Sequence, residues 1–122
     1  MPSPNRHPGI VPASDYRLAL SNTVVDVSTS RANFYGFLFE NNHTATVYVQ
    51  VFNKLASNVV LGTTVPDRTI MVPASAAFGK DATDFPLLYC DVAMSIACTA
   101  TRTGAGAPGA ALTSNVWFSN TP

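Results

Sequence analysis

The stretch TGAGAPGAAL (103–112) is the first place to look for chemistry, because Gly104, Gly106 and Gly109 match the pattern G-x-G-x-x-G. In dinucleotide-binding folds this pattern joins a strand to a helix whose N-terminus binds pyrophosphate, and an acidic residue follows about 20 positions later. Here the residues after the glycines contain no acid and have the pattern of a strand, and Pro108 interrupts the motif. The stretch therefore predicts a mobile hairpin loop between the last two strands rather than a nucleotide site.

The tripeptide N-H-T at 42–44 matches a glycosylation sequon, but no apolar secretory signal precedes it. Its residue types are those of a turn, so it predicts the hairpin connection between strands at 34–41 and 46–53. His7 and His43 are the only histidines, and neither has the neighbours typical of a catalytic triad or a metal site. We therefore expect that the protein is not an enzyme.

Carboxylates and thiols are sparse. Asp81, Asp84 and Asp91 surround one loop, as calcium-binding carboxylates do, but their spacing fits no known calcium loop. Cys90 and Cys98 fit neither a C-x-x-C motif nor a zinc pattern. On one straight strand they would lie about 26 Å apart, too far for a disulfide unless the chain bends at Asp91. We expect solvated acids, free thiols, no metal and no cofactor.

The composition suggests a surface that other molecules cover. Charged residues make up 11% of the 122-residue chain and the net charge is zero, whereas hydrophobic residues make up 47%. Most of the polarity comes from Ser, Thr and Asn, which suits strands with one solvated face. Low charge is also typical of interface cores. A neutral chain lacks the basic surface of a nucleic-acid binder, and no apolar run is long enough for a membrane span.

Residues 1–14 contain four prolines, which lack backbone donors and fix φ, so this segment cannot be a helix or an interior strand. It predicts either a disordered tail or an extended arm that docks on a neighbouring subunit. Ile10 and Val11, flanked by Pro8 and Pro12, favour the arm, because a free tail gains nothing from adjacent apolar residues.

From residue 15 onward, apolar and polar residues alternate with a period of two, which indicates strands. The expected strands are 16–20, 23–29, 34–41, 46–53, 68–72, 86–90, 92–101 and 112–120. A short edge strand is possible at 59–61, and 74–84 predicts a loop with one helical turn. No segment has helical spacing, so residues 15–122 predict one all-β domain, an antiparallel β-sandwich or jelly roll.

Aromatic residues occupy both faces of the expected strand at 34–39. Phe34, Tyr35, Phe37 and Phe39 alternate there, although a sandwich strand needs only one apolar face. One face should belong to the core, and the other is a candidate subunit interface or a stacking platform for carbohydrate.

Three runs of sequence resemble small virion-associated β-sandwich proteins of tailed phages. They are FYGFLFENNHTATVYVQVFN, TIMVPASAAF and LLYCDVAMSIACTATRTG, followed by a late NVWF. The resemblance covers about residues 33–118. Its motifs are short and typical of strands, and it assigns no role to Cys90 or Cys98.

The resemblance implies a capsid decoration, or cement, protein: a structural virion protein, often a homotrimer, on the outside of a phage head. Its partners would be the major capsid protein and further copies of itself, with no nucleic acid, membrane or small-molecule substrate. It would lie on the outer capsid surface, after assembly in the host cytoplasm. The alternative is a receptor- or glycan-binding domain of a phage head or tail fibre.

Overall fold

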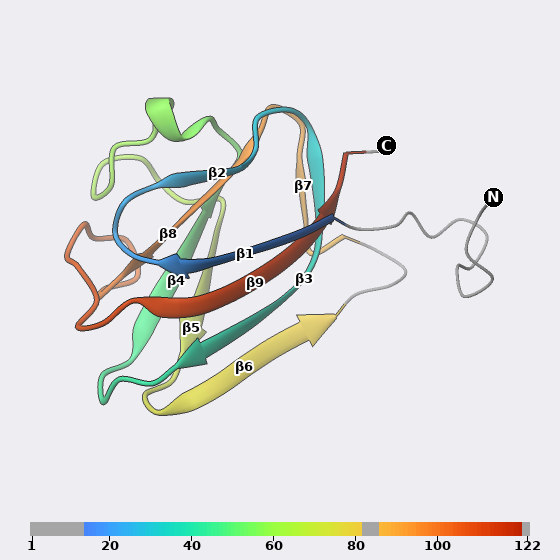
Figure 1. Ribbon diagram of the computed structural model, residues 1–122. Helices are drawn as coiled ribbons and strands as arrows, with labels where there is room; N and C mark the ends of the chain where they lie inside the picture. The colour runs from blue at the N-terminus through green and yellow to red at the C-terminus, as the bar shows by residue number, and fades with distance from the viewer. Residues whose placement is uncertain (1–13, 82–85, 121–122) are drawn as a thin grey trace, which may run out of the picture.

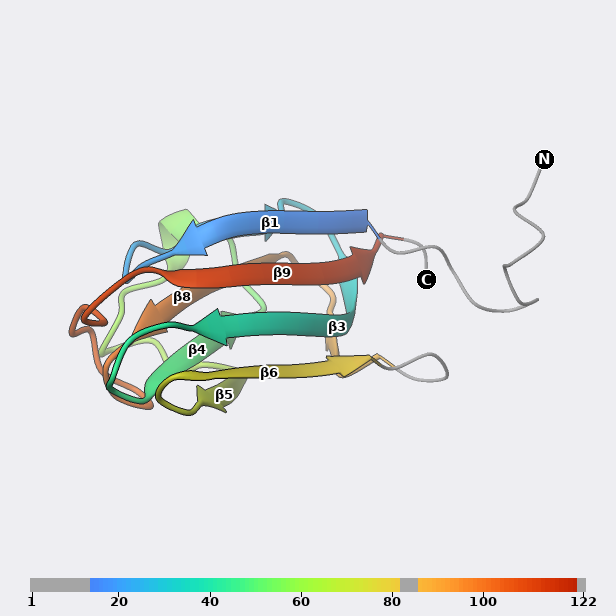
Figure 2. The same cartoon turned by 60° about the horizontal axis from the view of Figure 1, so that its bottom comes forward.

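The protein is an all-β sandwich of two antiparallel sheets packed face to face (Figures 1 and 2). The computed structural model describes residues 14–81 and 86–120, so the arm at 1–13 lies outside the described residues. The described chain forms nine strands and one 3-10 turn: β1 (Ser14–Leu20), β2 (Val25–Ser28), β3 (Ala32–Asn41), β4 (Val47–Phe52), η1 (Ala56–Asn58), β5 (Arg68–Val72), β6 (Ala76–Asp81), β7 (Leu88–Cys90), β8 (Met94–Thr99) and β9 (Leu112–Ser119).

The strands are wound as a jelly roll. Sheet A has the order β1-β9-β3-β6, with the short β7 also paired to β3, and sheet B has the order β2-β8-β4-β5. The antiparallel pairs are nested along the chain, because β1 pairs with β9, β2 with β8, β3 with β6 and β4 with β5. Such a ribbon, folded over itself, is the jelly-roll arrangement of an eight-stranded sandwich.

Alternation along the strands creates the core between the sheets. In β4, Val47, Val49 and Val51 point inward and are buried, as the period-two pattern predicts. Strand β3 contributes buried phenylalanines from the facing sheet, and β8 contributes Met94 and Ile96. Burial of these apolar side chains is the main force that holds the two sheets together.

The predicted hairpin at residues 42–44 is wrong, because β3 belongs to sheet A and β4 to sheet B. The segment instead crosses from one sheet to the other. Asn41 fixes this crossing: its side-chain amide donates hydrogen bonds to the carbonyls of Ala45 (2.9 Å) and Pro73 (3.1 Å), and its Oδ1 accepts one from His43 N–H (3.0 Å). Local turn chemistry is the same for a hairpin and for a crossing, so the sequence did not distinguish them.

The predicted loop at 74–84 is also wrong in part, since Ala76–Asp81 forms β6 along the edge of β3. The chain enters β6 through Ser75, whose φ of 54° lies in the left-handed region. The possible edge strand at 59–61 is absent from the described chain, and Val60 accepts the hydrogen bonds of a turn from Thr63 and Thr64. β6 was missed because Ala, Gly and Lys have low strand propensity.

A bulge in β3 explains why its aromatics share one face. The register with β9 shifts between Phe34 and Gly36, so that Tyr35 is the extra residue. Phe34 and Phe37, three positions apart, therefore both point inward, and their rings lie 6.0 Å apart. Phe37 also stacks on Phe39 at 4.8 Å. A strict period of two would have placed Phe34 and Phe37 on opposite faces.

Candidate interaction site on the open face of sheet A

The outer face of sheet B is covered by the chain's own loops. The glycine-containing loop at 100–111 folds back over β4 and β8, where Gln50 is fully buried. The Gln50 amide donates hydrogen bonds to Thr99 Oγ1 (2.8 Å) and to the carbonyl of Gly104 (3.0 Å). The guanidinium of Arg102 lies over the ring of Tyr48, 5.9 Å from its centre. This loop therefore completes the covering of the sheet.

That finding changes the prediction for the G-x-G-x-x-G stretch. The loop connects β8 of sheet B to β9 of sheet A, so it is a crossing between sheets rather than a hairpin. A strand follows the glycines, not the helix that a pyrophosphate site requires. Two hydrogen bonds fix the loop in place: the N–H of Ala100 donates to the Gly106 carbonyl (3.0 Å), and the side-chain amide of Asn22 donates to the Ala105 carbonyl (3.2 Å).

The long loop at 53–67 covers the outer face of sheet B at β2, β8 and the end of β4, whereas Met71 of β5 remains 49% exposed. Ser95 Oγ donates to the carbonyl of Lys54 (2.8 Å), and the N–H of Ala56 donates to Asp26 Oδ1 (2.8 Å). Phe52, on the outward face of β4, is fully buried beneath this loop. Both faces of β8 are consequently buried along its whole length.

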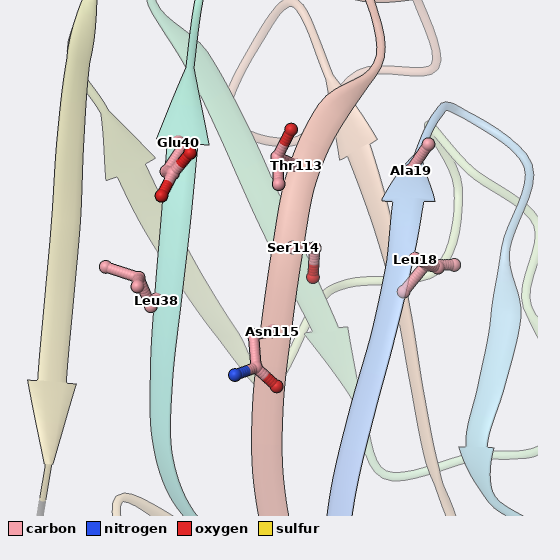
Figure 3. A pocket seen from close by; sticks show the side chains of 7 residues that line it. All are labelled: Leu18, Ala19, Leu38, Glu40, Thr113, Ser114 and Asn115. Carbon is pink, nitrogen blue, oxygen red and sulfur yellow. The ribbon is translucent and has the colours of Figure 1, made fainter.

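Sheet A has no such cover among the described residues, and its outer face is open in Figure 2. The register places Leu38 beside Asn115 and Glu40 beside Thr113 across β3 and β9. Together with Ala19 and the edge strand β1, they surround a shallow hollow of about 520 Å³ (Figure 3). Leu38 is 41% exposed there, although it lies in the middle of a sheet.

Few large side chains project from this face, because several of its residues are small and the indole of Trp117 packs against the sheet. Trp117 pairs with Gly36, and its indole lies so close that a Cβ on Gly36 would overlap the ring. Gly79 and Ala77 of β6 continue the small residues beyond Leu38 and Glu40. The face is therefore broad and shallow, a shape that suits contact with another protein surface better than enclosure of a small molecule.

Two polar atoms beneath this face have no hydrogen-bond partner in the described structure. They are Asn115 Oδ1 and Ser114 Oγ, and Ser114 lies on the inward face of β9, opposite Phe39. Buried polar atoms are satisfied in the great majority of cases, by protein or by ordered water. Glu40, which is exposed, is the charged residue among those that line the hollow. The exposed carboxylate of Glu40 can thus accept hydrogen bonds from donors of a partner, beside an apolar contact at Leu38.

The predicted interface residues fall in different places. Phe34, Phe37 and Phe39 are buried in the core, so they do not form a second, exposed aromatic face, and Tyr35 at the bulge is half-buried. Pro8, Ile10, Val11 and Pro12 lie outside the described residues.

The sequence analysis did not single out Leu38 or Asn115. The signal was present in part: Leu38 and Glu40 alternate with the buried phenylalanines of β3, and therefore occupy its outward face. What the local pattern could not show was that the outer face of sheet B is covered whereas that of sheet A is open.

Both cysteines are free and buried, in agreement with the prediction of free thiols, but for a different reason. They are not on one strand, because Cys90 ends β7 in sheet A and Cys98 lies in β8 of sheet B. Burial raises the pKa of the Cys90 thiol to about 12, and the carboxylates of Asp67 and Asp91 add to the rise. Burial alone raises the pKa of Cys98 to about 12. Neither thiol is activated as a nucleophile.

Of the three acids around the loop, the structure describes the side chain of Asp91 alone. Asp84 lies outside the described residues, and Asp91 accepts a hydrogen bond from the side chain of Asn53 (2.6 Å). The described residues contain no group of three His, Cys, Asp or Glu side chains that could hold a metal ion. His43, in the sequon at 42–44, accepts a hydrogen bond at Nδ1 from the N–H of Ala45 (3.3 Å).

Within the described chain there is no helix with the length and apolar character that crossing a membrane requires. The chain matches no protein-family model, and comparisons with characterised proteins and with solved structures give no significant match.

Proposed function

We propose that the protein is a structural virion protein of the capsid decoration type, which binds the outside of a phage head and stabilises it through contacts between subunits. The observation that carries this proposal is the difference between the two outer faces. The chain covers most of the outer face of sheet B with its own loops but leaves that of sheet A open and shallow around Leu38. An exposed apolar side chain at the centre of an open sheet face suits a surface that a partner covers.

Two further features support the proposal. The runs of sequence that resemble virion-associated β-sandwich proteins lie mostly in β3, β4, β5, β8 and β9, which make up most of both sheets. The jelly roll occurs in viral capsid domains, although it also occurs in lectins and enzymes, so the fold alone does not decide the function. In this proposal the partners are the major capsid protein and other copies of the chain, assembled as a homotrimer, and the role is not catalytic.

The test is co-sedimentation of the purified protein with heads of the phage that encodes it. Leu38→Glu places a charge at the centre of the open face and should abolish binding. Val65→Glu is the matched control, because Val65 is 80% exposed in the loop that covers sheet B. Binding by wild type and by Val65→Glu, but not by Leu38→Glu, is the expected result. If wild type does not sediment with the heads, or if Leu38→Glu binds equally well, the proposal fails.

One observation favours the alternative of a glycan-binding fibre domain. Trp117, the single tryptophan, is half-buried on the outward side of β9, on the same side as Asn115. An aromatic ring beside polar side chains is the arrangement that binds sugars by stacking and hydrogen bonding. Glycan-array binding that is lost in Trp117→Ala, together with wild-type affinity of that variant for heads, would support this alternative.

A further inference from the structure

A second surface lies at the side of the sandwich where β5 and β6 form the neighbouring edges of the two sheets (Figure 2). A groove of about 400 Å³ runs between them. Its lining consists of Phe37, Arg68, Thr69, Ile70, Met71, Phe78, Lys80 and Leu87. It is separate from the open face of sheet A, because Phe78 and Lys80 pair with the inward-pointing Phe39 and Phe37, whereas Leu38 points outward.

Both borders of the groove are strand edges. Among the described residues, β5 pairs only with β4 and β6 pairs only with β3. Each therefore presents one row of backbone N–H and C=O groups that no described strand uses. An exposed edge of this kind is a template for an added strand.

The groove has an apolar floor that the sandwich does not close. Phe78 is 43% exposed, whereas Phe37 and Ile70, which also line the groove, are buried. The ring of Phe37 lies 5.5 Å from that of Phe78 and stacks on Phe39, so the floor is continuous with the core. An apolar side chain entering the groove would add to a surface that is already ordered.

The charges at the groove have one sign. Arg68 on β5 and Lys80 on β6 are both exposed, and the described lining contains no acid. Two such grooves facing one another would bring four cations together, which disfavours pairing of identical edges between copies. A segment that carries a carboxylate would instead form ion pairs while its backbone joins the edge.

From this geometry we infer that the groove binds an extended, acidic segment of a partner protein, which adds to β6 as a further strand. Phe78 and Lys80 are two positions apart on one face of β6, so the segment needs an apolar residue and an acid at the same spacing. The apolar residue would contact Phe78, and the acid would pair with Lys80 and Arg68. The inference does not depend on the role of the open face of sheet A.

The competing explanation is that Arg68 and Lys80 only prevent aggregation, since charged residues on edge strands commonly block unwanted pairing. The two explanations differ in what the charges select. A blocking role requires only that charge be present, whereas a binding site requires that the segment carry the opposite sign.

The test uses a fluorescein-labelled peptide, acetyl-Thr-Val-Thr-Glu-Thr-Val-Thr-amide, titrated with the full chain by fluorescence anisotropy at low salt. A peptide with Lys in place of Glu, and a peptide of the same composition with Val and Glu adjacent, are the controls. We expect the first peptide to bind at least tenfold more tightly than either control. The double variant Arg68→Glu and Lys80→Glu should reverse the preference toward the Lys peptide.

Phe78→Ser should weaken binding of every peptide, whereas Leu38→Ser, which removes a similarly exposed apolar side chain from the outward face of sheet A, should not. Circular dichroism and thermal melting check that each variant is folded. If the Glu peptide shows no preference over its controls up to millimolar concentration, or if charge reversal leaves the preference unchanged, the inference is wrong and the charges have only the blocking role.

Discussion

The indole of Trp117 lies directly against Gly36, its cross-strand partner in sheet A. A Cβ at position 36 would overlap the ring and would also lie 2.7 Å from the backbone carbonyl of Lys80. Gly36 is therefore required by the close approach of its neighbours, and the tryptophan covers the backbone that glycine leaves bare.

Gly36→Ala should consequently destabilise the protein by about 1–3 kcal/mol, the usual cost of an overpacked site. Urea unfolding followed by tryptophan fluorescence measures this change, and the emission of Trp117 should also shift because the ring must move. Gly106→Ala is the control, since the nearest atom to a Cβ there is 3.9 Å away. Equal stabilities for the two variants would contradict the packing described for Gly36.

Gln50 supplies a second prediction, because its buried amide holds the loop at 100–111 against sheet B through Gly104. In Gln50→Glu the side chain cannot donate to that carbonyl while ionised, and burial without a partner should raise its pKa. The neutral carboxyl keeps one donor for the two acceptors, so the variant should be somewhat less stable than wild type at pH 4 and lose at least about 2 kcal/mol more by pH 7.

Chemical unfolding at the two pH values tests this dependence. Gln50→Leu is the control, since it also removes the hydrogen bonds but does not titrate, so its loss of stability should not change between pH 4 and pH 7. A Gln50→Glu variant whose stability relative to wild type is independent of pH would refute the prediction.

The two buried thiols predict that the folded protein loses stability at alkaline pH. The pKa of each of Cys90 and Cys98 rises to about 12 on folding, from an ordinary value of 9.0. Between these values the folded state holds protons that the unfolded state releases, so this contribution to stability is complete below pH 9 and is lost as the pH rises toward 12. Urea unfolding from pH 8 to pH 11 should show a decline that is shallower in the variant with both cysteines replaced by Ala.

Thiol titration provides the companion measurement. The native protein at pH 8 should react slowly, whereas denaturation without reductant should release two reactive thiols per chain, since both are free and buried. Fast reaction of the native protein would show that the thiols are accessible.

Deletion of residues 1–13 separates the two explanations for the arm. The cut precedes Ser14, where β1 begins to pair with β9, so the sandwich keeps every strand pair. We expect the melting temperature of the truncated protein to stay within about 2 °C of wild type, and its binding to phage heads to weaken clearly. Unchanged binding would mean that the arm is only a tail.

The sequence predicted the fold class and most strands because their signal is local. β4 and β5 alternate cleanly, and Pro73 ends β5 where expected. Partnership between strands is not local, which is why the segment at 42–44 was assigned to a hairpin. The bulge at Tyr35 likewise depends on β9, which is distant in the chain. Its single extra residue puts Phe34 on the same face as Phe37 and Phe39, whereas a strict period of two predicts the opposite face.

The candidate site was harder to predict from the sequence than the strands were, because its exposure depends on which sheet faces the loops cover. Nothing in the loop at 100–111 shows that it lies on sheet B, and its small residues suggested mobility instead. Leu38 is exposed because no described segment crosses sheet A, a property of the whole arrangement rather than of the residues around Leu38.

The position of β9 has a consequence for how the protein is made. It follows every other described strand in the chain, yet it lies between β1 and β3 in sheet A, and β1 has no other partner in the described structure. Before β9 emerges from the ribosome, β3 can already pair with β6 and β7, and the strands of sheet B can pair with one another, but β1 remains separate. Sheet A can therefore close only after β9 has been made, and until then the edges of β1 and β3 that β9 will join are exposed.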